Sequence, residues 1–254
     1  MSSHLLSAVR RLFKIPHGDT PNKFFLNDGK LEDELLEYSK IFRSVNHGVI
    51  KWAHYPSIYE SLFMHLRNKE NLRLLEIGVQ FGGSLELLRE YFHSSSIIFG
   101  IDIDPRCNIL NEEGFNVRIG SQSDERFLSS VVKEMGGLDI VIDDGSHNSR
   151  HQKISFERLF PLLNEGGLYV VEDVEHSYFR NQSGFPFLPS TFMNRAKRST
   201  EELNKHFRTY NKWGQLKGIQ DNLWSITFYS SVIVFEKRQR KFPKVLRQGK
   251  HAWT

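Results

Sequence analysis

The sequence predicts an α/β protein built around a doubly wound, mostly parallel sheet. Between residues 73 and 171, short apolar runs alternate with segments of helical spacing, and such runs are typical of strands that helices cover on both faces. The first run leads into a glycine turn and an amphipathic segment, as the first strand–turn–helix unit of such a sheet does. Two β-rich runs near the end, 224–229 and 231–236, predict a closing antiparallel pair. The expected sheet therefore has seven strands.

The parallel strands and the helices between them are expected at defined positions. The strands are Arg73–Ile77, Ile97–Ile101, Asn116–Ile119, Leu138–Ile142 and Leu168–Val171. Helices are expected at 84–93, 106–113, 125–135 and 149–163, and Gly166-Gly167 is a typical stop for the last of them. Ahead of the first strand, residues 31–42 and 58–66 also have helical spacing. This order indicates a Rossmann-like sheet with an N-terminal helical extension.

The bulk composition indicates a cytoplasmic protein with one large domain. The chain has 254 residues, of which 39% are hydrophobic and 13% aromatic, enough to bury a substantial core. No apolar run approaches the roughly 18 residues of a membrane span, and no signal-peptide pattern is present. The single cysteine, Cys107, excludes an intrachain disulfide and a cysteine-based zinc site. We expect an N-terminal helical extension (1–50), a main domain (51–240) and a basic C-terminal tail (241–254).

The net charge of +4 is concentrated at the two ends of the chain. Basic residues crowd the C-terminus over 237–250, and such a run is most often a solvated tail. The alternative is contact with an anionic lipid or a nucleic acid. Residues 1–15 have helical spacing with a basic polar side. They indicate a helix docked on this domain or on a second subunit, with peripheral membrane contact as the alternative.

The glycine turn after the first strand indicates a site for a cationic ligand. A dinucleotide site requires G-x-G-x-x-G, with a pyrophosphate at the helix N-terminus. Here the spacing is G-x-x-x-G-G, with Gly78 and Gly82 as its first two glycines and Ser84 at the start of the expected helix. Glu76 lies two residues before the first glycine. A carboxylate at this point repels a pyrophosphate and suits a cation.

Polar residues after the second and third strands are suited to bind a nucleoside. Asp102 follows the second strand, and its carboxylate can accept hydrogen bonds from both hydroxyls of a ribose. Asp102 is the candidate for this role, and Asp104 is instead suited to cap the next helix. After the third strand, Gln122 and Asp124 are candidates for an adenine edge, and Asp124 is equally suited to be a helix N-cap.

Carboxylates follow the fourth and fifth strands. Asp143 and Asp144 end one strand, and Glu172 and Asp173 end its expected neighbour, roughly 4.8 Å away. Asp144, Glu172 and Asp173 would repel one another at this edge unless a cation offset their charges. Magnesium prefers oxygen ligands and keeps positions open for substrate oxygens. We therefore expect a Mg²⁺ site; the alternative is that these acids cap helices and face water.

A histidine beside this cluster is the candidate general base. His147 lies three residues after Asp144, past a glycine turn, and the imidazole pKa is near the working pH of such a base. His151 is a weaker alternative. Five residues on either side of this region are candidates to line an acceptor pocket, with packing as the more common role for such residues: His54, Tyr55, Tyr59, His176 and Tyr178.

Three motifs together resemble one group of enzymes. They are Leu-Glu-Ile-Gly at 75–78, Ile-Asp-Asp-Gly-Ser-His at 142–147 and Gly-Gly-Leu-Tyr-Val-Val-Glu-Asp at 166–173. They resemble the metal-dependent macrolide sugar O-methyltransferases of class I, of the mycinamicin 2''-O-methyltransferase type, over roughly residues 50–236. The resemblance implies S-adenosylmethionine (SAM) as cofactor and Mg²⁺ held by the second aspartate of D-D-G-S-H and the Glu-Asp pair, with the histidine as base. It also implies that Asp143 lies close to the cofactor.

The expected function is SAM-dependent, Mg²⁺-dependent methylation of a hydroxyl on a sugar or a glycosylated small molecule. The expected partners are this acceptor and a second copy of the chain. One alternative is a nicotinamide-dependent oxidoreductase, which the glycine spacing and Glu76 disfavour. Another is a binding protein that keeps the fold without the chemistry. A nucleic-acid methyltransferase is disfavoured because no N-P-P-[YF]-type motif follows the fourth strand.

Overall fold

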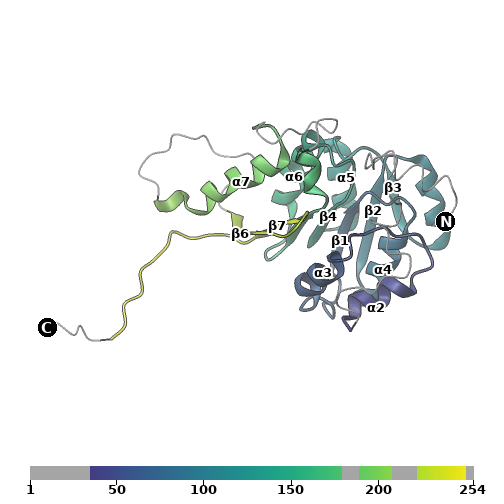
Figure 1. Cartoon of the computed structure of the whole chain (residues 1–254), viewed down its shortest axis with the longest axis horizontal. Coiled ribbons are helices and arrows are strands. Elements are labelled where there is room, and N and C mark those ends of the chain that lie inside the picture. The colour runs from purple at the N-terminus through teal and green to yellow at the C-terminus, as the bar shows by residue number, and fades with distance from the viewer. Residues whose placement is uncertain (1–34, 179–188, 208–221, 250–254) are drawn as a thin grey trace, which may run out of the picture.

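The computed structural model describes residues 35–178, 189–207 and 222–249. The expected basic helix over residues 1–15 lies outside these ranges. The described residues form a seven-stranded sheet with the order β3-β2-β1-β4-β5-β7-β6 (Figure 1). Its strands are β1 (Arg73–Ile77), β2 (Ile97–Asp102), β3 (Asn116–Ile119), β4 (Ile140–Asp143), β5 (Leu168–Val171), β6 (Leu223–Phe228) and β7 (Ile233–Lys237).

The pairing of the strands confirms the predicted topology. Strands β1 to β5 pair in parallel with one another. Strand β7 pairs antiparallel with both β5 and β6. The chain order reverses at β1, since β2 lies on one side of it and β4 on the other. Ligands of open α/β sheets bind at such a switch point, outside the carboxyl ends of the strands.

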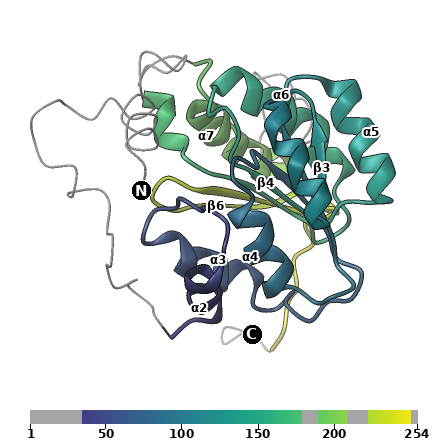
Figure 2. The ribbon, with the colours of Figure 1, turned by 90° about the vertical axis from the view of Figure 1, so that its right-hand side faces the viewer.

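Helices cover both faces of the sheet, which gives three layers (Figure 2). On one face lie α2 (Glu37–Ser44), α3 (Tyr55–Phe63) and α4 (Gly83–Tyr91). On the other lie α5 (Glu125–Met135), α6 (Ser149–Leu159) and α7 (Phe192–Leu203). Short 3₁₀ segments complete the description: η2 (Pro105–Glu113), η3 (Phe160–Leu162), η4 (Val174–Tyr178) and η6 (Lys205–Phe207).

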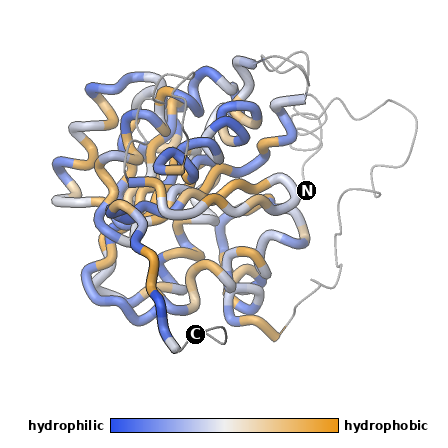
Figure 3. Tube along the Cα trace, turned by 90° about the vertical axis from the view of Figure 1, so that its left-hand side faces the viewer, coloured by the Kyte–Doolittle hydropathy of each residue, from blue (hydrophilic) through white to orange (hydrophobic). Residues whose placement is uncertain are grey.

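Alternating strand residues build the two largest of three apolar cores in the described residues, because successive side chains of a strand point to opposite faces. On β1, Leu74 packs with α2, α3 and α4, whereas Leu75 and Ile77 pack with α5, α6 and α7. The same alternation divides Val170 from Val171 on β5. In Figure 3 the hydrophobic stretches accordingly gather along the strands between the helical layers. The unbroken apolar runs in the sequence result from this burial on both faces.

Most differences from the expected elements have a local cause. The helix expected at 149–163 ends at Leu159 and continues as the 3₁₀ turn η3, where Pro161 cannot donate the next helical hydrogen bond. The segment at 106–113 is 3₁₀ rather than α-helical. Helix α3 begins three residues earlier than expected, with Pro56 in its first turn. Helix α7 was not predicted.

The two ends of the described chain contact the main body. Tyr38 of α2 stacks on Tyr59 of α3 with ring centroids 5.1 Å apart, so α2 belongs to the core on its face. In the basic run, Lys237 donates to the carbonyl of Pro161 at 2.6 Å, and Arg240 donates to the carbonyl of Leu203 at 2.5 Å. Beyond these contacts the chain extends away from the body (Figure 1). Among the described residues, no helix combines the length and apolarity needed to cross a bilayer.

The first glycine of the turn is the position most sensitive to a side chain. Gly78 has φ +94°, and a Cβ there would lie 2.2 Å from the carbonyl oxygen of Asp144. We expect Gly78→Ala to lower the free energy of unfolding by about 3 kcal/mol or more, because backbone strain adds to a backbone clash. Urea denaturation would measure the change.

Gly114→Ala is the matched control. Gly114 also has a left-handed φ, +82°, but a Cβ there would meet nothing within 4 Å. Only the conformational cost remains, about 1 kcal/mol. Equal losses in the two variants would show that the approach to Asp144 is not what requires a glycine at residue 78.

Candidate functional site

The glycine turn brings the end of β1 against the end of β4. The amide of Asp144 donates to the carbonyl of Ile77 at 2.9 Å, next to the close approach at Gly78. Gly82 is the N-cap of α4 with φ +86°, and Gly83 packs so tightly that a Cβ would lie 2.6 Å from the carbonyl oxygens of His47 and Gly48. The turn, the end of β4 and residues 47–48 are therefore fixed relative to one another.

The segment before α3 is attached to α4 through Glu86. The buried carboxylate of Glu86 accepts hydrogen bonds from the backbone amides of Asn46 and His47 and from both of their side chains, at 2.8–3.1 Å. Against the effect of burial, these bonds lower the pKa of Glu86 to about 2. Residues 46–48 are thus held beside the glycine turn by a fully charged carboxylate.

Asp102 orders the turn from the end of β2. Its Oδ2 accepts hydrogen bonds from the amides of Val79 and Gln80 at 2.9 and 3.0 Å, and its Oδ1 accepts one from the amide of Asp104. Asp104 itself accepts from the amide of Arg106 at the start of η2. The capping role that the sequence offered for Asp104 is therefore confirmed, whereas contact of Asp102 with a ribose stays a prediction.

The residues after β3 have structural partners. Asp124 caps α5 by accepting from the amides of Arg126 and Phe127, which confirms the capping reading. Gln122 is buried and bridges two loops: its Nε2 donates to Asp143 at 3.0 Å, and its Oε1 accepts from the amide of Ser146 at 2.7 Å. Contact of either residue with an adenine stays a prediction.

Asp143 lies inside the protein as a hub of hydrogen bonds. It is fully buried and accepts from Gln122, from the Ser155 hydroxyl at 2.7 Å and from the Tyr169 hydroxyl at 3.0 Å. Burial raises its pKa, and these three donors act in the opposite direction. The first aspartate of the D-D-G-S-H motif thus joins β4, β5, α6 and the loop after β3.

Glu76 is a buried acid with unusual electrostatics. It is completely buried on β1, and neither oxygen receives a hydrogen bond of ordinary geometry from the described residues. Burial raises the pKa of Glu76 to about 7, opposed by the charge of Lys51 and by the Ser84 hydroxyl at the start of α4. An acid in this state gains from the approach of a cation.

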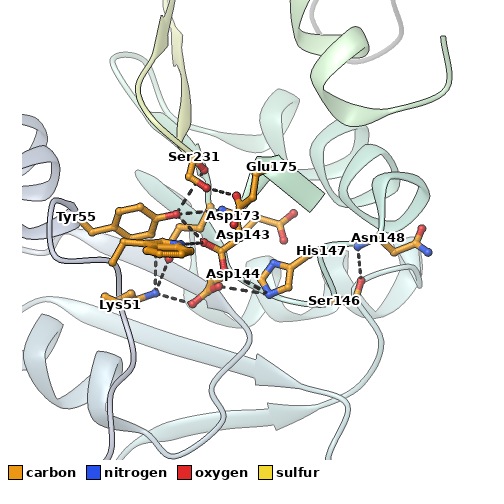
Figure 4. A network of polar contacts seen from close by, with 12 residues as sticks. Lys51, Tyr55, Asp143, Asp144, Ser146, His147, Asn148, Asp173, Glu175 and Ser231 are labelled. Carbon is orange, nitrogen blue, oxygen red and sulfur yellow. Dashed lines mark hydrogen bonds and ion pairs between the residues drawn. The ribbon is translucent and has the colours of Figure 1, made fainter. Parts of the chain in front are cut away.

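The three carboxylates predicted to hold a metal lie around the ends of β4 and β5: Asp144 and Asp173 face His147 (Figure 4), and Glu172 shares Lys51 with Asp144. Lys51 reaches into this cluster: its Nζ lies 2.5 Å from Asp144 Oδ2 and 2.7 Å from both oxygens of Glu172. Burial raises the pKa of Glu172, and the charges of Asp144 and Asp173 raise it further. The carboxylates thus repel one another, as expected from the sequence, and the Lys51 ammonium offsets part of this repulsion.

Aromatic side chains of residues 52–59 also donate hydrogen bonds to Asp173 and Glu172. The Tyr55 hydroxyl donates to Asp173 Oδ1 at 2.6 Å, and the Trp52 indole donates to the same oxygen at 3.2 Å. The Tyr59 hydroxyl donates to Glu172. Tyr55 and Tyr59, which the sequence suggested for an acceptor pocket, are instead buried partners of the carboxylates.

His147 faces the cluster from the loop after β4. Its Nε2 lies 3.9 Å from Asp144 Oδ1 and 3.9 Å from Asp173 Oδ2 (Figure 4). Both His147 and Asp173 have φ +53°, a conformation that costs energy for residues other than glycine and that clusters at functional sites. The ring of His176 lies against it with centroids 4.7 Å apart, and the pKa of His176 is lowered to about 4, chiefly by burial. His151 instead contacts the Ser146 hydroxyl at 3.0 Å.

This donor set fits a divalent cation. Asp144, Glu172 and Asp173 supply carboxylate oxygens, the ligands that Mg²⁺ prefers, and the Lys51 ammonium already shows that a positive charge is accepted between two of them. Among the described residues, the grouping whose ligand atoms all lie within 4.8 Å of one another is a different one, formed by His147, Asp173 and His176. The nitrogens of this grouping suit a borderline metal ion better. Asp173 belongs to both groupings.

Sequence motifs located one half of the site and missed the other. Of the predicted residues at the ends of β4 and β5, Asp144 and Asp173 face His147 and Glu172 shares Lys51 with Asp144, whereas Asp143 faces the interior. Lys51 contacts Asp144 and Glu172, and Trp52 contacts Asp173. Neither residue belongs to a motif, and the sequence analysis did not predict them. The only signal was the density of Lys, Trp, His and Tyr over residues 51–59, which has no characteristic spacing.

Sequence comparison relates the chain to sugar O-methyltransferases. No protein-family model matches it. It is 40% identical over 140 residues to the "8-demethyl-8-(2-methoxy-alpha-L-rhamnosyl)-tetracenomycin-C 3'-O-methyltransferase" of Streptomyces olivaceus, which covers 52% of this chain and 35% of that protein. It is 34% identical over 163 residues to the mycinamicin VI 2''-O-methyltransferase of Micromonospora griseorubida, covering 61% of this chain and 40% of that one. The chain thus spans less than half the length of these curated relatives.

Comparison of structures gives the same relation. MycE methyltransferase from the mycinamycin biosynthetic pathway, solved in complex with Mg and SAH, superposes with a TM-score of 0.69 and 29% identity, over 81% of this chain and 55% of MycE. MycE in complex with Mg, SAH and mycinamycin VI superposes with a TM-score of 0.67. The seven-stranded sheet is therefore the MycE fold. The resemblance predicted from the motifs is confirmed: in sequence and in fold, this chain is similar to the macrolide sugar O-methyltransferases.

Proposed function

We propose that this protein is a SAM-dependent, Mg²⁺-dependent O-methyltransferase that acts on a hydroxyl of a sugar or of a glycosylated small molecule. The observation that carries the proposal is the convergence of Asp144, Glu172, Asp173 and His147 at the switch point of the sheet, next to the glycine turn. Relatives at 34–40% identity are named as methyltransferases of rhamnosyl and macrolide compounds. The nicotinamide-dependent alternative is not favoured, because the similar proteins described above are methyltransferases.

The cofactor would bind over the glycine turn. Glu76 would meet the positive charge of SAM, and the backbone of Gly78 and Gly82 would leave room for its close approach. Asp102 would accept hydrogen bonds from the ribose, in addition to ordering the turn. The other residues proposed for this half of the site are Ser84, Gln122, Asp124 and Asp143. SAM carries a methyl group already activated on a sulfonium, so positioning supplies much of the catalysis.

The metal would be held by Asp144, Glu172 and Asp173. When bound, Mg²⁺ would lower the pKa of an acceptor hydroxyl by withdrawing charge from its oxygen. His147 would take the proton of that hydroxyl at Nε2, the ring atom that faces Asp144 and Asp173. Since His176 keeps a neutral ring against His147 around neutral pH, it would hold the orientation of His147 without adding a second positive charge.

The remaining partners are proposals of the same kind. We propose a homo-oligomer in the cytoplasm, with residues 51–240 as the methyltransferase domain between the N-terminal extension and the basic tail. Peripheral membrane contact by the N-terminal extension stays an alternative to its docking on a second subunit. The acceptor would be small, since the relatives act on glycosylated natural products according to their names.

Calorimetric titration of the protein with SAM and with NADH, each with and without Mg²⁺, tests the proposed cofactor. We expect micromolar affinity for SAM and no binding of NADH. The reason is the buried Glu76, which attracts a cation and repels a pyrophosphate. Binding of NADH in place of SAM would restore the oxidoreductase alternative, and binding of neither would favour a protein without this chemistry.

His147→Ala tests the proposed base. We expect turnover of a sugar acceptor to fall by roughly 10²–10⁴, the usual contribution of a general base, while calorimetry shows unchanged binding of SAM. His151→Ala is the matched control, because His151 lies on the same loop-to-helix segment but contacts Ser146 rather than the carboxylates. Turnover within threefold of the wild type in His147→Ala, or an equal loss in His151→Ala, would remove His147 from this role.

The pH dependence of SAM binding tests Glu76. Its pKa of about 7 in the folded protein is above its ordinary value. The stabilisation due to this raised pKa is therefore complete below the ordinary pKa and is lost as the pH rises through about 7. A bound cation offsets the loss, so we expect the increase in Tm given by SAM to grow between roughly pH 6 and pH 8. Glu76→Gln should show a flat profile by differential scanning fluorimetry; a growing profile in that variant would assign the effect to another group.

A further inference from the structure

Lys51 is a buried cation inside the carboxylate cluster. Its side chain is only 5% exposed, and its ammonium contacts one oxygen of Asp144 (Figure 4). It also contacts both oxygens of Glu172. Burial alone would lower the pKa of Lys51, but the charges of Asp144, Glu172 and Glu76 outweigh burial and raise this pKa well above its ordinary value. With carboxylate oxygens of Asp144 and Glu172 at 2.5 and 2.7 Å from Nζ, Lys51 is held in the site as an ammonium ion.

The ammonium uses the same oxygens that the proposed metal would need. At 2.5 and 2.7 Å from Asp144 and Glu172, Nζ lies in the space between the two carboxylates. Mg²⁺ binds such oxygens at about 2.1 Å and requires near-octahedral geometry around itself. A divalent cation and an ammonium cannot both have these contacts, and their charges repel one another in a buried site.

The cluster also has the charge to accept either cation. Three carboxylates and one ammonium leave a net charge of about −2 if all are ionised, and exchange of Lys51 for Mg²⁺ would leave about −1. Asp173 stays available in both cases, because its Oδ2 faces His147 while Oδ1 is held by Tyr55 and Trp52. The other oxygen of Asp144, Oδ1, faces His147 in the same way.

We propose that Lys51 is an internal counter-ion that competes with the divalent cation, so that metal binding displaces its ammonium from Asp144 and Glu172. This inference rests on the metal site of the proposed function. Without metal, the Lys51 ammonium neutralises part of the charge of Asp144 and Glu172. Because the metal must displace it, Lys51 lowers the affinity of the site for the metal.

Displacement would also connect the metal with the cofactor half of the site. Lys51 belongs to the segment whose residues 46–48 are bound to Glu86 and packed against Gly83 of the turn. Its neighbour Trp52 donates to Asp173. A change in the contacts of Lys51 therefore acts on a segment that contacts both the glycine turn and the carboxylates. If this segment couples the two sites, bound metal changes the affinity for SAM by the same factor as bound SAM changes the affinity for metal.

Metal affinity in position-51 variants tests the competition. Free Mn²⁺, a probe that accepts the same oxygen ligands, would be measured by electron paramagnetic resonance with the whole chain. We expect Lys51→Met to bind Mn²⁺ at least roughly tenfold more tightly than the wild type, because the competing charge is gone. Lys51→Arg keeps the charge and should stay within about threefold of the wild type. Unchanged or weaker binding by Lys51→Met would overturn the proposal.

Lys69→Met is the matched control for loss of a lysine. Lys69 pairs with the largely buried carboxylate of Asp139 at 3.1 Å, outside the cluster. Its removal should leave Mn²⁺ affinity unchanged. An equal gain in this variant would show that the effect of Lys51→Met is the general loss of one positive charge, and would also overturn the proposal.

Labelling of the unmodified protein separates displacement from simple repulsion and does not depend on the folding of a variant. An amine-acylating reagent followed by mass spectrometry would report the access to each lysine. We expect Lys51 to be protected without metal and labelled several-fold faster at saturating Mn²⁺, with no change at Lys69, whose side chain is 44% exposed in either case. Continued protection of Lys51 at saturating Mn²⁺ would mean that the ammonium stays in place.

Asp144→Asn distinguishes failure of this inference from failure of the proposed metal site. If wild type and Lys51→Met both fail to bind Mn²⁺, the metal site is wrong and the competition falls with it. If Asp144→Asn abolishes Mn²⁺ binding but Lys51→Met binds as the wild type does, the metal site stands and only the role of Lys51 is overturned.

Discussion

The site depends on the crowding of like charges at one edge of the sheet. Neighbouring parallel strands β4 and β5 place Asp144, Glu172 and Asp173 together, and burial makes their mutual repulsion expensive. The surrounding structure is arranged to offset it. Lys51 supplies a charge, the hydroxyls of Tyr55 and Tyr59 and the indole of Trp52 supply donors, and the left-handed backbone at His147 and Asp173 sets where the side chains point.

The sequence predicted those parts of the fold that local patterns determine. The parallel strands, the glycine turn and the convergence of the acids follow from burial on both faces and from the rule that parallel strands end at one edge. Helix α5 was predicted with its observed ends, because Asp124 caps it and Gly136 ends it. By contrast, Lys51 reaches Glu172 across 121 positions of sequence, and no local pattern records such a contact.

The D-D-G-S-H motif illustrates how one motif serves two purposes. Its second aspartate and its histidine face the cluster, whereas its first aspartate, Asp143, faces the interior. Through Gln122, Ser155 and Tyr169, Asp143 connects the loop after β3 with α6 and β5. Residue types alone made both aspartates appear to be parts of a ligand site; the backbone alternation at the end of β4 divides their roles.

The packing of residues 47–48 against α4 determines which cofactors the fold can accept. In dinucleotide-binding sheets, the first helix N-terminus receives the pyrophosphate. Here the carbonyl oxygens of His47 and Gly48 lie against Gly83, the first residue of that helix, and the charged Glu86 lies one turn further on. The protein's own chain thus places partial and full negative charge beside the first turn of the helix. Discrimination against phosphorylated cofactors is built into the backbone at this helix, so exchange of a few surface side chains would not convert the site into one for a dinucleotide.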